Sequence, residues 1–280
     1  MTVLTVLPYP DISPSIDLGP LTIHWYGVMY AVGIMLGWWL GTLRARRPGS
    51  GWTSDEVSDL IMWSALGVVL GGRLGYVLFY GLDKAIADPL WIIKFNQGGM
   101  SFHGGLLGVL LAVWIFGRKT HRGFWQVADF IAPLVPLGLF FGRMGNFING
   151  ELWGKPTDLP WAMVFPSADD QPRHPTMLYE AALEGLVLFT VLWIFSRRSR
   201  PTRAISGVFL LLYGCFRFWV EFFRIPDVQL GYLALDWLTM GQILSIPMIL
   251  GGILLLWLAY RDRPTVADPA PVDGQVGSEK

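Results

Sequence analysis

Seven long apolar stretches constrain this chain more than any other feature of its sequence. A helix that crosses a bilayer needs about 20 consecutive apolar residues, with a workable range of about 17 to 25. The stretches that meet or approach this length cover residues 21–43, 60–80, 102–117, 124–141, 176–195, 205–223 and 241–260. With 53% hydrophobic and only 15% charged residues, the chain is too apolar for a soluble domain of its size. We therefore predict an all-α polytopic membrane protein with seven transmembrane helices.

The positions of the cations predict the orientation of these helices. Short cytoplasmic loops of membrane proteins collect Lys and Arg. Basic clusters follow the first, third, fifth and seventh stretches, within residues 44–47, 118–122, 197–203 and 261–263, whereas the other connections hold few cations. This alternation predicts an N-terminus on the outer, periplasmic side and a C-terminus in the cytoplasm.

The same pattern divides the chain into three parts. Residues 1–20 form a periplasmic N-terminal segment, and residues 21–260 form the seven-helix domain. Within that domain, residues 143–175 contain polar and Pro-rich sequence without a span-length apolar run, so they predict a small periplasmic cap after the fourth helix. Residues 261–280 are rich in Pro, Asp and Gly and predict a disordered cytoplasmic tail.

Charge and cysteine content exclude several classes of function. The net charge is zero, so global charge indicates no nucleic-acid partner. The single cysteine, Cys215, excludes an internal disulfide framework and a multi-cysteine metal site. The four His residues lie in different connections and form no close ligand pair, so we expect no metal.

The sequence GRMGNFINGELWG, residues 142–154, concentrates polar side chains where the fourth predicted helix reaches the outer surface. It combines Arg143, Asn146, Asn149 and Glu151 with four glycines. Glycine lets backbone approach a ligand closely, and charge-assisted hydrogen bonds bind anions well. The motif therefore predicts a pocket for a polar, anionic group. An elaborate helix cap is the alternative.

Other polar residues within the stretches converge on the same outer leaflet. Tyr213, Arg217 and Glu221 follow one another at a spacing of four, and Tyr26 opens the first stretch. An Arg near the bilayer centre costs about 2.5 to 3.5 kcal/mol on insertion scales, so Arg217 should face the bundle interior or a polar cavity. The same argument applies to Arg73 in the second stretch, for which pairing with a carboxylate of the fifth stretch is the structural alternative.

These residue types suit phosphate binding. Guanidinium groups bind phosphate oxygens two at a time, so Arg143 and Arg217 together can hold one phosphodiester. Asn146 and Asn149 are candidate partners for hydroxyl groups. Glu151 and Glu221 would orient the arginines.

His103 is the candidate general base if a nucleophile must lose a proton. A thiol has a reference pKa of about 8.5 and imidazole one of about 6.5, so the two exchange a proton readily. A His that anchors a loop at the membrane interface is the alternative.

The motif of residues 142–154 resembles the signature of the bacterial prolipoprotein diacylglyceryl transferases. The resemblance extends through HWYG (24–27), GGRLGYVLFY (71–80), GGMSFHGG (98–105), RHPTMLYE (173–180), RFWVEFFR (217–224) and MGQILSIPM (240–248). It therefore covers nearly the whole chain apart from the extreme N-terminus and the tail.

This resemblance implies an inner-membrane enzyme without a cofactor. Such an enzyme transfers the diacylglyceryl group of phosphatidylglycerol to the lipobox cysteine of a preprolipoprotein, whose signal peptide lies in the membrane. It releases glycerol 1-phosphate and forms a thioether, which is the first step of lipoprotein maturation. The resemblance places Tyr26, His103, Arg143 and Arg217 among the catalytic residues, with His103 as the base. Asn146, Glu151, Gly154, Tyr213 and Glu221 also fall on positions that are important in the family. We expect them, together with Arg143, Arg217 and Asn149, to bind phosphatidylglycerol.

Two other classes of protein also hold such polar groups in a membrane. A transporter for an anionic solute would use the arginines as its binding ring, although the chain shows no internal repeat. A structural scaffold would leave unexplained why so many ionisable groups share one depth.

Overall fold

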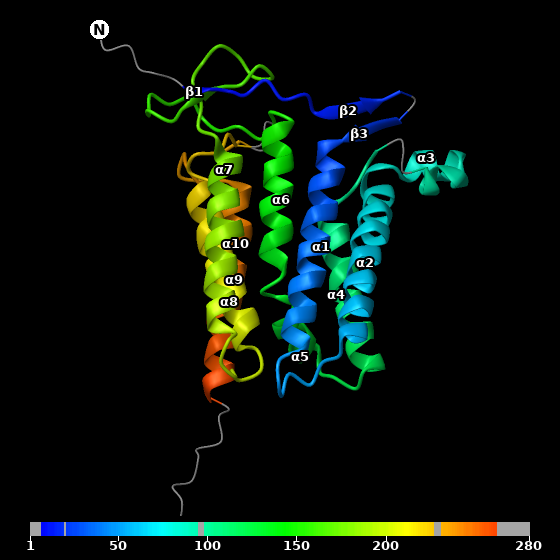
Figure 1. Ribbon diagram of the computed structural model, residues 1–280. Helices are drawn as coiled ribbons and strands as arrows, with labels where there is room; N and C mark the ends of the chain where they lie inside the picture. The colour runs from blue at the N-terminus through cyan, green and yellow to red at the C-terminus, as the bar shows by residue number, and fades with distance from the viewer. Residues whose placement is uncertain (1–6, 20, 95–97, 227–230, 262–280) are drawn as a thin grey trace, which may run out of the picture.

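The computed structural model describes residues 7–19, 21–94, 98–226 and 231–261, which form an elongated bundle of helices running side by side (Figure 1). At one end, which we call the cap end, lie the short strands β1 to β4. The helix α5 (Phe124–Ile131) lies at the opposite end. The predicted segment 1–20 is described only in part, and the predicted tail beyond Arg261 lies outside the described residues.

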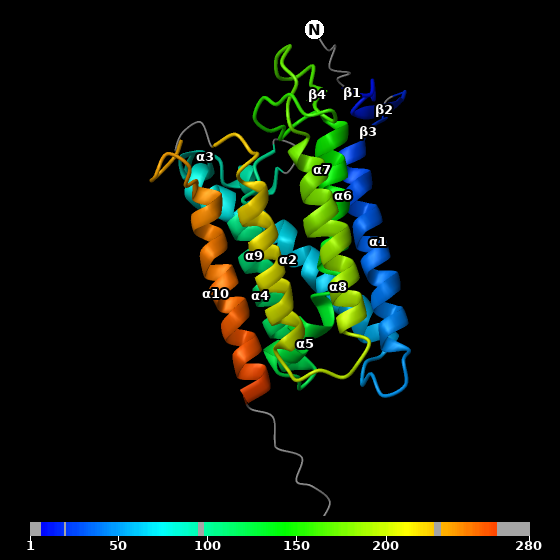
Figure 2. The same cartoon turned by 90° about the vertical axis from the view of Figure 1, so that its left-hand side faces the viewer.

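Every one of the seven apolar stretches contains helix. The helices at these stretches are α1 (Trp25–Ala45), α2 (Ser54–Tyr80), α4 (Phe102–Lys119), α5 with α6 (Val135–Ile148), the run α7 (Thr176–Glu180), η3 (Ala181–Val187) and α8 (Leu188–Phe195), α9 (Ala204–Val220) and α10 (Met240–Arg261). Figure 2 shows α9 beside α10, with the run α7 to α8 next to α9.

Four of these elements are long and apolar enough to cross a membrane. They are α1, α2, the run Thr176–Phe195 and α10, and the bent pair of α5 and α6 makes a fifth if it counts as one span. Their outer surfaces carry large exposed apolar side chains such as Leu78, Leu107 and Leu250. A surface of this kind suits lipid rather than water. The structure is thus mostly helical and has the character of a polytopic membrane protein.

Two helices begin at positions other than those expected from hydrophobicity. The first stretch starts with β3 (Leu21–His24), which pairs with β2 (Ser15–Leu18), so α1 begins only at Trp25. Helix α2 begins earlier than residue 60, at Ser54. Thr53 and Glu56 form a reciprocal capping box there, with N–O distances of 2.8 and 3.2 Å, and this fixes the helix start in polar sequence.

The fourth stretch is broken rather than continuous. Helices α5 and α6 meet at a break after Ile131 with a bend of 49°. Pro133 and Pro136 lie at this break. Proline lacks the N–H that would continue the helical hydrogen bonds, which accounts for the bend. Helix α6 then continues to Ile148, so residues 143–148 of the predicted cap are helical.

The remainder of the cap, after Asn149, is irregular backbone. Within it, β4 (Met163–Val164) pairs in parallel with β1 (Leu7–Pro8) near the N-terminus. The hydroxyl of Tyr9 donates to the carbonyl oxygens of Phe147 and Ile148 at 2.6 and 2.9 Å. The N-terminal segment is therefore attached to the end of α6.

Two buried charges in the bundle have partners in the backbone. Arg73 donates to the carbonyl oxygens of Trp91 and Ile92 at 2.6 and 2.8 Å, which replaces the predicted pairing with a carboxylate of the fifth stretch. Arg73 thereby holds the short helix η1 (Pro89–Ile93), which follows α3 (Leu82–Ala87) at the cap end. At the other end, Asp129 accepts from the backbone N–H groups of Arg203 and Ser206 and caps the start of α9.

Glycines bring α2 and α4 into close contact. A Cβ atom at Gly71 would clash with the carbonyl oxygen of Gly104 and lie 2.9 Å from Cα of Gly108. In the same way, a Cβ atom at Gly67 would meet Gly108, and one at Gly75 would meet Gly104. Glycines at a spacing of four therefore serve the packing of α2 on α4.

Replacing Gly71 with Ala should destabilise the bundle. The added methyl group overpacks the α2–α4 contact, which typically costs about 1–3 kcal/mol in the free energy of unfolding. The matched control is Gly37→Ala in α1, where a Cβ meets no heavy atom within 4 Å. The measurement is the thermal unfolding midpoint of both purified variants in detergent. Equal midpoints for the two variants would show that the glycine contact has no energetic importance.

Candidate active site

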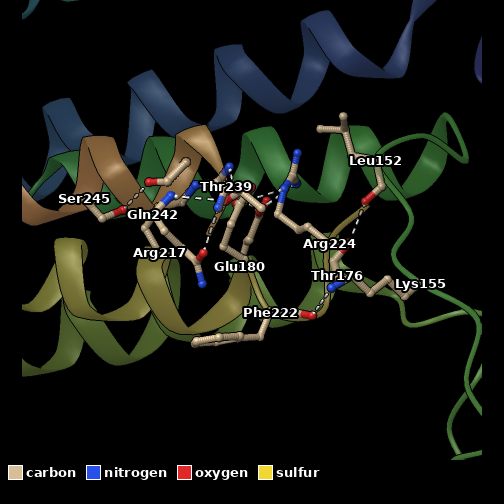
Figure 3. Close-up of polar contacts among 12 residues, drawn as sticks. Leu152, Lys155, Thr176, Glu180, Arg217, Phe222, Arg224, Thr239, Gln242 and Ser245 are labelled. Carbon is tan, nitrogen blue, oxygen red and sulfur yellow. Dashed lines mark hydrogen bonds and ion pairs between the residues drawn. The ribbon is translucent and has the colours of Figure 1, made fainter. Parts of the chain in front are cut away.

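The carboxylate of Glu180, at the end of α7, contacts three arginine side chains, of which Figure 3 labels Arg217 and Arg224. Its Oε2 atom is 2.6 Å from Nε of Arg143 on α6. Its Oε1 atom accepts from Nη1 of Arg217 on α9 and, at 2.8 Å, from Nη1 of Arg224 just beyond α9. The Glu180 side chain on α7 therefore brings together cations from two other segments, α6 and the end of α9, that are distant in sequence.

Glu221 provides a second carboxylate for two of these arginines. Its Oε2 atom lies 3.0 Å from Nη2 of Arg217 and 3.4 Å from Nε of Arg224. The carboxylate packs against Gly241 in the first turn of α10, where a Cβ atom would lie only 2.6 Å from its Cδ atom. Glycine at this position lets the start of α10 approach the site. We call Arg143, Arg217, Arg224, Glu180 and Glu221 the arginine cluster.

The cluster is layered by burial. The side chain of Glu180 is fully buried, and that of Glu221 is 7% exposed. The side chains of Arg143, Arg217 and Arg224 are 22%, 19% and 16% exposed. The carboxylates therefore form an inner layer and the guanidinium groups the more accessible one. Because each charge has an opposite partner, the buried charges do not carry the full desolvation cost of isolated ions.

Unsatisfied polar atoms gather at this cluster. In the described part of the chain, the buried side-chain atoms without a hydrogen-bond partner are Ser64 Oγ and six atoms of Glu180, Glu184, Glu221, Arg224 and Gln242. Some of the six take part in ion pairs, but neither oxygen of the fully buried Glu184 has a hydrogen bond. Glu184 lies on the π-helical element η3. Both π-helical turns and unsatisfied buried groups are found preferentially at functional sites.

The motif of residues 142–154 contributes a chain of hydrogen bonds next to Arg143. Nη1 of Arg143 donates to Oδ1 of Asn146 at 3.3 Å, and Nδ2 of Asn146 donates to Oε1 of Glu151 at 2.8 Å. Asn149 donates to the same Glu151 oxygen at 3.3 Å. Asn149 is also the C-cap residue of α6. The motif thus ends a helix and connects to the arginine cluster at the same time.

Gly154 lies where the cap crosses the end of α9. It forms an antiparallel bridge with Arg224, and its N–H donates to the carbonyl oxygen of His174 at 2.8 Å. A Cβ atom at this position would clash with the carbonyl oxygen of Phe223 and lie 2.6 Å from Cγ2 of Thr176. Only glycine permits this crossing, which holds Arg224 next to the cap.

The two predicted tyrosines lie on elements that contribute to the cluster or pack beside it. The ring of Tyr26, in the first turn of α1, would be 2.8 Å from a Cβ atom at Gly145, which belongs to the motif of residues 142–154. Tyr213 lies on α9 one helical turn before Arg217, and its ring stacks on Phe209. Both side chains are half-buried.

His103 does not join this group in the structure. It lies exposed in the first turn of α4, with its ring 5.7 Å from that of Phe102. Within the described residues, no hydrogen bond or ion pair connects His103 to the arginine cluster. The predicted base, His103, and the predicted phosphate-binding arginines are therefore not in direct contact in the structure.

A different histidine, His174, lies in the cap. Its Nδ1 atom is 3.0 Å from the hydroxyl of Tyr179, which also accepts from Trp161. Burial lowers the pKa of His174, and the nearby positive charge of Lys155 lowers it further. Its imidazole is therefore neutral at pH 7, which suits a structural hydrogen bond.

Sequence reasoning gave no site role to Glu180, Glu184 or Arg224. The signals were present, since Glu180 and Glu184 are four residues apart and Arg224 follows Arg217 by two helical turns. What the sequence did not show is that one carboxylate would contact arginines from both α6 and the end of α9. Among the described residues, no group of three or more His, Cys, Asp or Glu side chains is arranged to hold a metal ion.

Comparison with known proteins identifies one family, both by a family model and by individual relatives. A family model described as "Prolipoprotein diacylglyceryl transferase" matches residues 14–258. The chain is 60% identical to the phosphatidylglycerol–prolipoprotein diacylglyceryl transferase of Azotobacter vinelandii over 264 residues, covering 94% of this chain and 100% of the relative. It is 57% identical to the protein of the same name from Pseudomonas fluorescens over 263 residues, covering 92% and 98%. It is also 60% identical to that of Pseudomonas aeruginosa over 257 residues, covering 91% and 97%.

Replacing Gly154 with Ala should loosen the contact between the cap and the end of α9. The N–H of Lys155 donates to the carbonyl oxygen of Phe223 at 2.9 Å, and a methyl group at residue 154 would push that carbonyl away. Hydrogen exchange measured by mass spectrometry should show faster exchange in peptides that contain Lys155. Gly138→Ala, where a Cβ has no neighbour within 4 Å, is the control. Unchanged exchange in Gly154→Ala would contradict this role of Gly154.

Proposed function

This chain belongs to the prolipoprotein diacylglyceryl transferase family, and on that basis we propose that it transfers the diacylglyceryl group of phosphatidylglycerol to the lipobox cysteine of preprolipoproteins. The thiol sulfur forms a bond to the glycerol carbon, and the bond from that carbon to the phosphate oxygen breaks. The products are a thioether on the cysteine and glycerol 1-phosphate. This reaction is the first step of lipoprotein maturation.

The observation that carries the proposal is the gathering of three partly accessible arginines at the cap end of the bundle. The substrate phosphodiester has one negative charge, and the leaving phosphate monoester gains a second. Guanidinium groups fixed before the reaction stabilise that developing charge without further reorganisation. In a low-dielectric membrane setting, such an interaction is stronger than in water.

The remaining predicted residues have supporting roles in this proposal. Asn146 and Asn149 share Glu151 as acceptor, and Asn146 also accepts from Arg143, so they can orient the headgroup and its arginine. Glu221 orients Arg217. Tyr26 and Tyr213 line the region as hydroxyl donors or walls, and Gly154 fixes the position of Arg224.

His103 remains our candidate for the base that deprotonates the cysteine. Its exposure at the start of α4 leaves the imidazole accessible to a thiol that arrives from the membrane. In this role the proton passes from sulfur to the imidazole, and the resulting thiolate attacks the glycerol carbon. No metal or redox cofactor is required by this reaction.

The proposal includes the seven-span arrangement in the bacterial inner membrane. We place the cap end on the periplasmic side, with residues 1–20 there and residues 261–280 in the cytoplasm. Basic residues at the α5 end, such as Arg44, Arg122 and Arg200, support this orientation. Both the lipid and the signal peptide are then accessible from the outer leaflet.

Replacing Arg143 with Ala should abolish transfer in a purified system. The wild-type protein in detergent is incubated with phosphatidylglycerol and a synthetic lipobox peptide, and the peptide is analysed by mass spectrometry. We expect a diacylglyceryl mass on the cysteine with the wild-type chain and a loss of at least about 100-fold with Arg143→Ala, because a lost donor to a developing charge costs about 10²–10³ in rate. Lys94→Gln, which removes an exposed cation paired with Asp88, is the control. An unmodified peptide with folded wild-type protein would favour an anion transporter instead.

Cysteine labelling tests the orientation. In a Cys215→Ser background, Asp170→Cys places a thiol in the exposed cap, and Ser199→Cys places one in the exposed α8–α9 connection. A membrane-impermeant maleimide should label Asp170→Cys in spheroplasts and label Ser199→Cys only after lysis. The reverse pattern would refute the proposed topology.

A further inference from the structure

Arg224 has the same carboxylate partners as Arg217. Both arginines donate to Oε1 of Glu180, and both lie within 3.4 Å of Oε2 of Glu221. Their exposed fractions, 16% and 19%, are also close. The electrostatic setting that makes Arg217 a candidate phosphate ligand therefore applies equally to Arg224.

Glu180 determines how the three guanidinium groups face one another. Its two oxygens fix Arg143 from one side and Arg217 with Arg224 from the other. A carboxylate that accepts from several guanidinium groups resembles a phosphate in charge and in its acceptor oxygens. It therefore holds in advance the geometry that an arriving phosphate requires, and then shares the guanidinium donors with that phosphate.

Burial argues against a purely structural ion-pair network. Apolar side chains of similar volume often stabilise a fold as well as buried ion pairs do. Here the carboxylates are 0% and 7% exposed, whereas all three arginines keep 16–22% of their side-chain surface. The cationic side of the network is thus the side that a ligand can reach.

From these contacts we propose that Glu180 is a positioning residue that holds Arg143, Arg217 and Arg224 as one phosphate site, and that Arg224 is the third phosphate-binding side chain. This inference rests on the proposed function. The third cation matters most when the phosphate gains its second negative charge, so the released phosphate monoester should depend on Arg224 more than the phosphodiester substrate does.

Steady-state kinetics of the full-length protein test this inference. The transfer assay measures kcat, KM for phosphatidylglycerol and inhibition by glycerol 1-phosphate, the doubly charged product. A hydrogen bond to a charged group contributes about 1.5–3 kcal/mol, so losing one corresponds to about 10- to 100-fold. Arg224→Gln should weaken glycerol 1-phosphate inhibition by this factor and raise KM by less. Arg224→Lys keeps the positive charge but lacks the planar guanidinium that binds two phosphate oxygens, so it should recover part of the inhibition.

Glu180→Gln should lower kcat without raising KM for phosphatidylglycerol. Removing the carboxylate frees guanidinium donors for the lipid, so KM for phosphatidylglycerol should stay the same or fall. The arginines lose their common anchor, so kcat should fall at least about tenfold. If Glu180 only stabilised the fold, the substitution would lower the amount of active protein but would leave kcat per folded molecule and KM unchanged. Lys94→Gln is the matched single-cation control at the same end of the molecule.

The proposed function and the roles of Arg224 and Glu180 can be refuted separately. Absence of transfer by folded wild-type protein would refute the proposed function itself. If the wild-type and Lys94→Gln proteins transfer normally, while Arg224→Gln keeps glycerol 1-phosphate inhibition within twofold of wild type, the inference about Arg224 is wrong. Should Arg224→Gln fail to fold, Arg224→Lys decides, since unchanged inhibition in that variant would overturn the assignment. A raised KM in Glu180→Gln would overturn the positioning role of Glu180.

Discussion

The structure around the candidate site depends on one fully buried carboxylate. Without Glu180, the described ion pairs would leave Arg217 and Arg224 with Glu221 alone and Arg143 with no carboxylate, and mutual repulsion would separate the three guanidinium groups. Without the arginines, Glu180 would be a buried anion in an apolar bundle, at a cost of several kcal/mol. Each half of the cluster requires the other. The run from α7 to η3, α6 and the end of α9 must therefore meet at the same depth.

Glycines allow the backbone to come close enough for this arrangement. Gly241 lets the start of α10 pack on Glu221, and Gly154 lets the cap cross the end of α9. Away from the site, Gly71 performs the same task between α2 and α4. Between helices in lipid there is little hydrophobic driving force, so close packing and polar contacts supply the specificity.

Much of this architecture follows from the sequence alone, because hydrophobic length identifies membrane helices well. The seven stretches all contain helix, yet the break at Pro133 and the strand at Leu21–His24 were not apparent from hydrophobicity averaged over a span. The site was predicted as a group of residues at one depth, and Arg143, Arg217 and Glu221 do lie together. Sequence spacing relates residues within a helix only, so it could not reveal that Glu180 joins Arg143 to Arg217. Likewise, it could not show that His103, although in the resembling segment, has no described bond to the cluster.

The capping of α9 by Asp129 has a mechanical consequence. The segment of α5 and α6 is attached to α9 at both ends of the bundle, through Asp129 with Ser206 at one end and through the shared Glu180 at the other. Contacts at both ends of the bundle restrain the separation of α9 from the bent α5–α6 segment more than a contact at one end would. Relative movement of α6 and α9 at the cap end would have to break the contacts of Glu180 with Arg143 or Arg217, so these contacts resist a change in the separation of the two arginines.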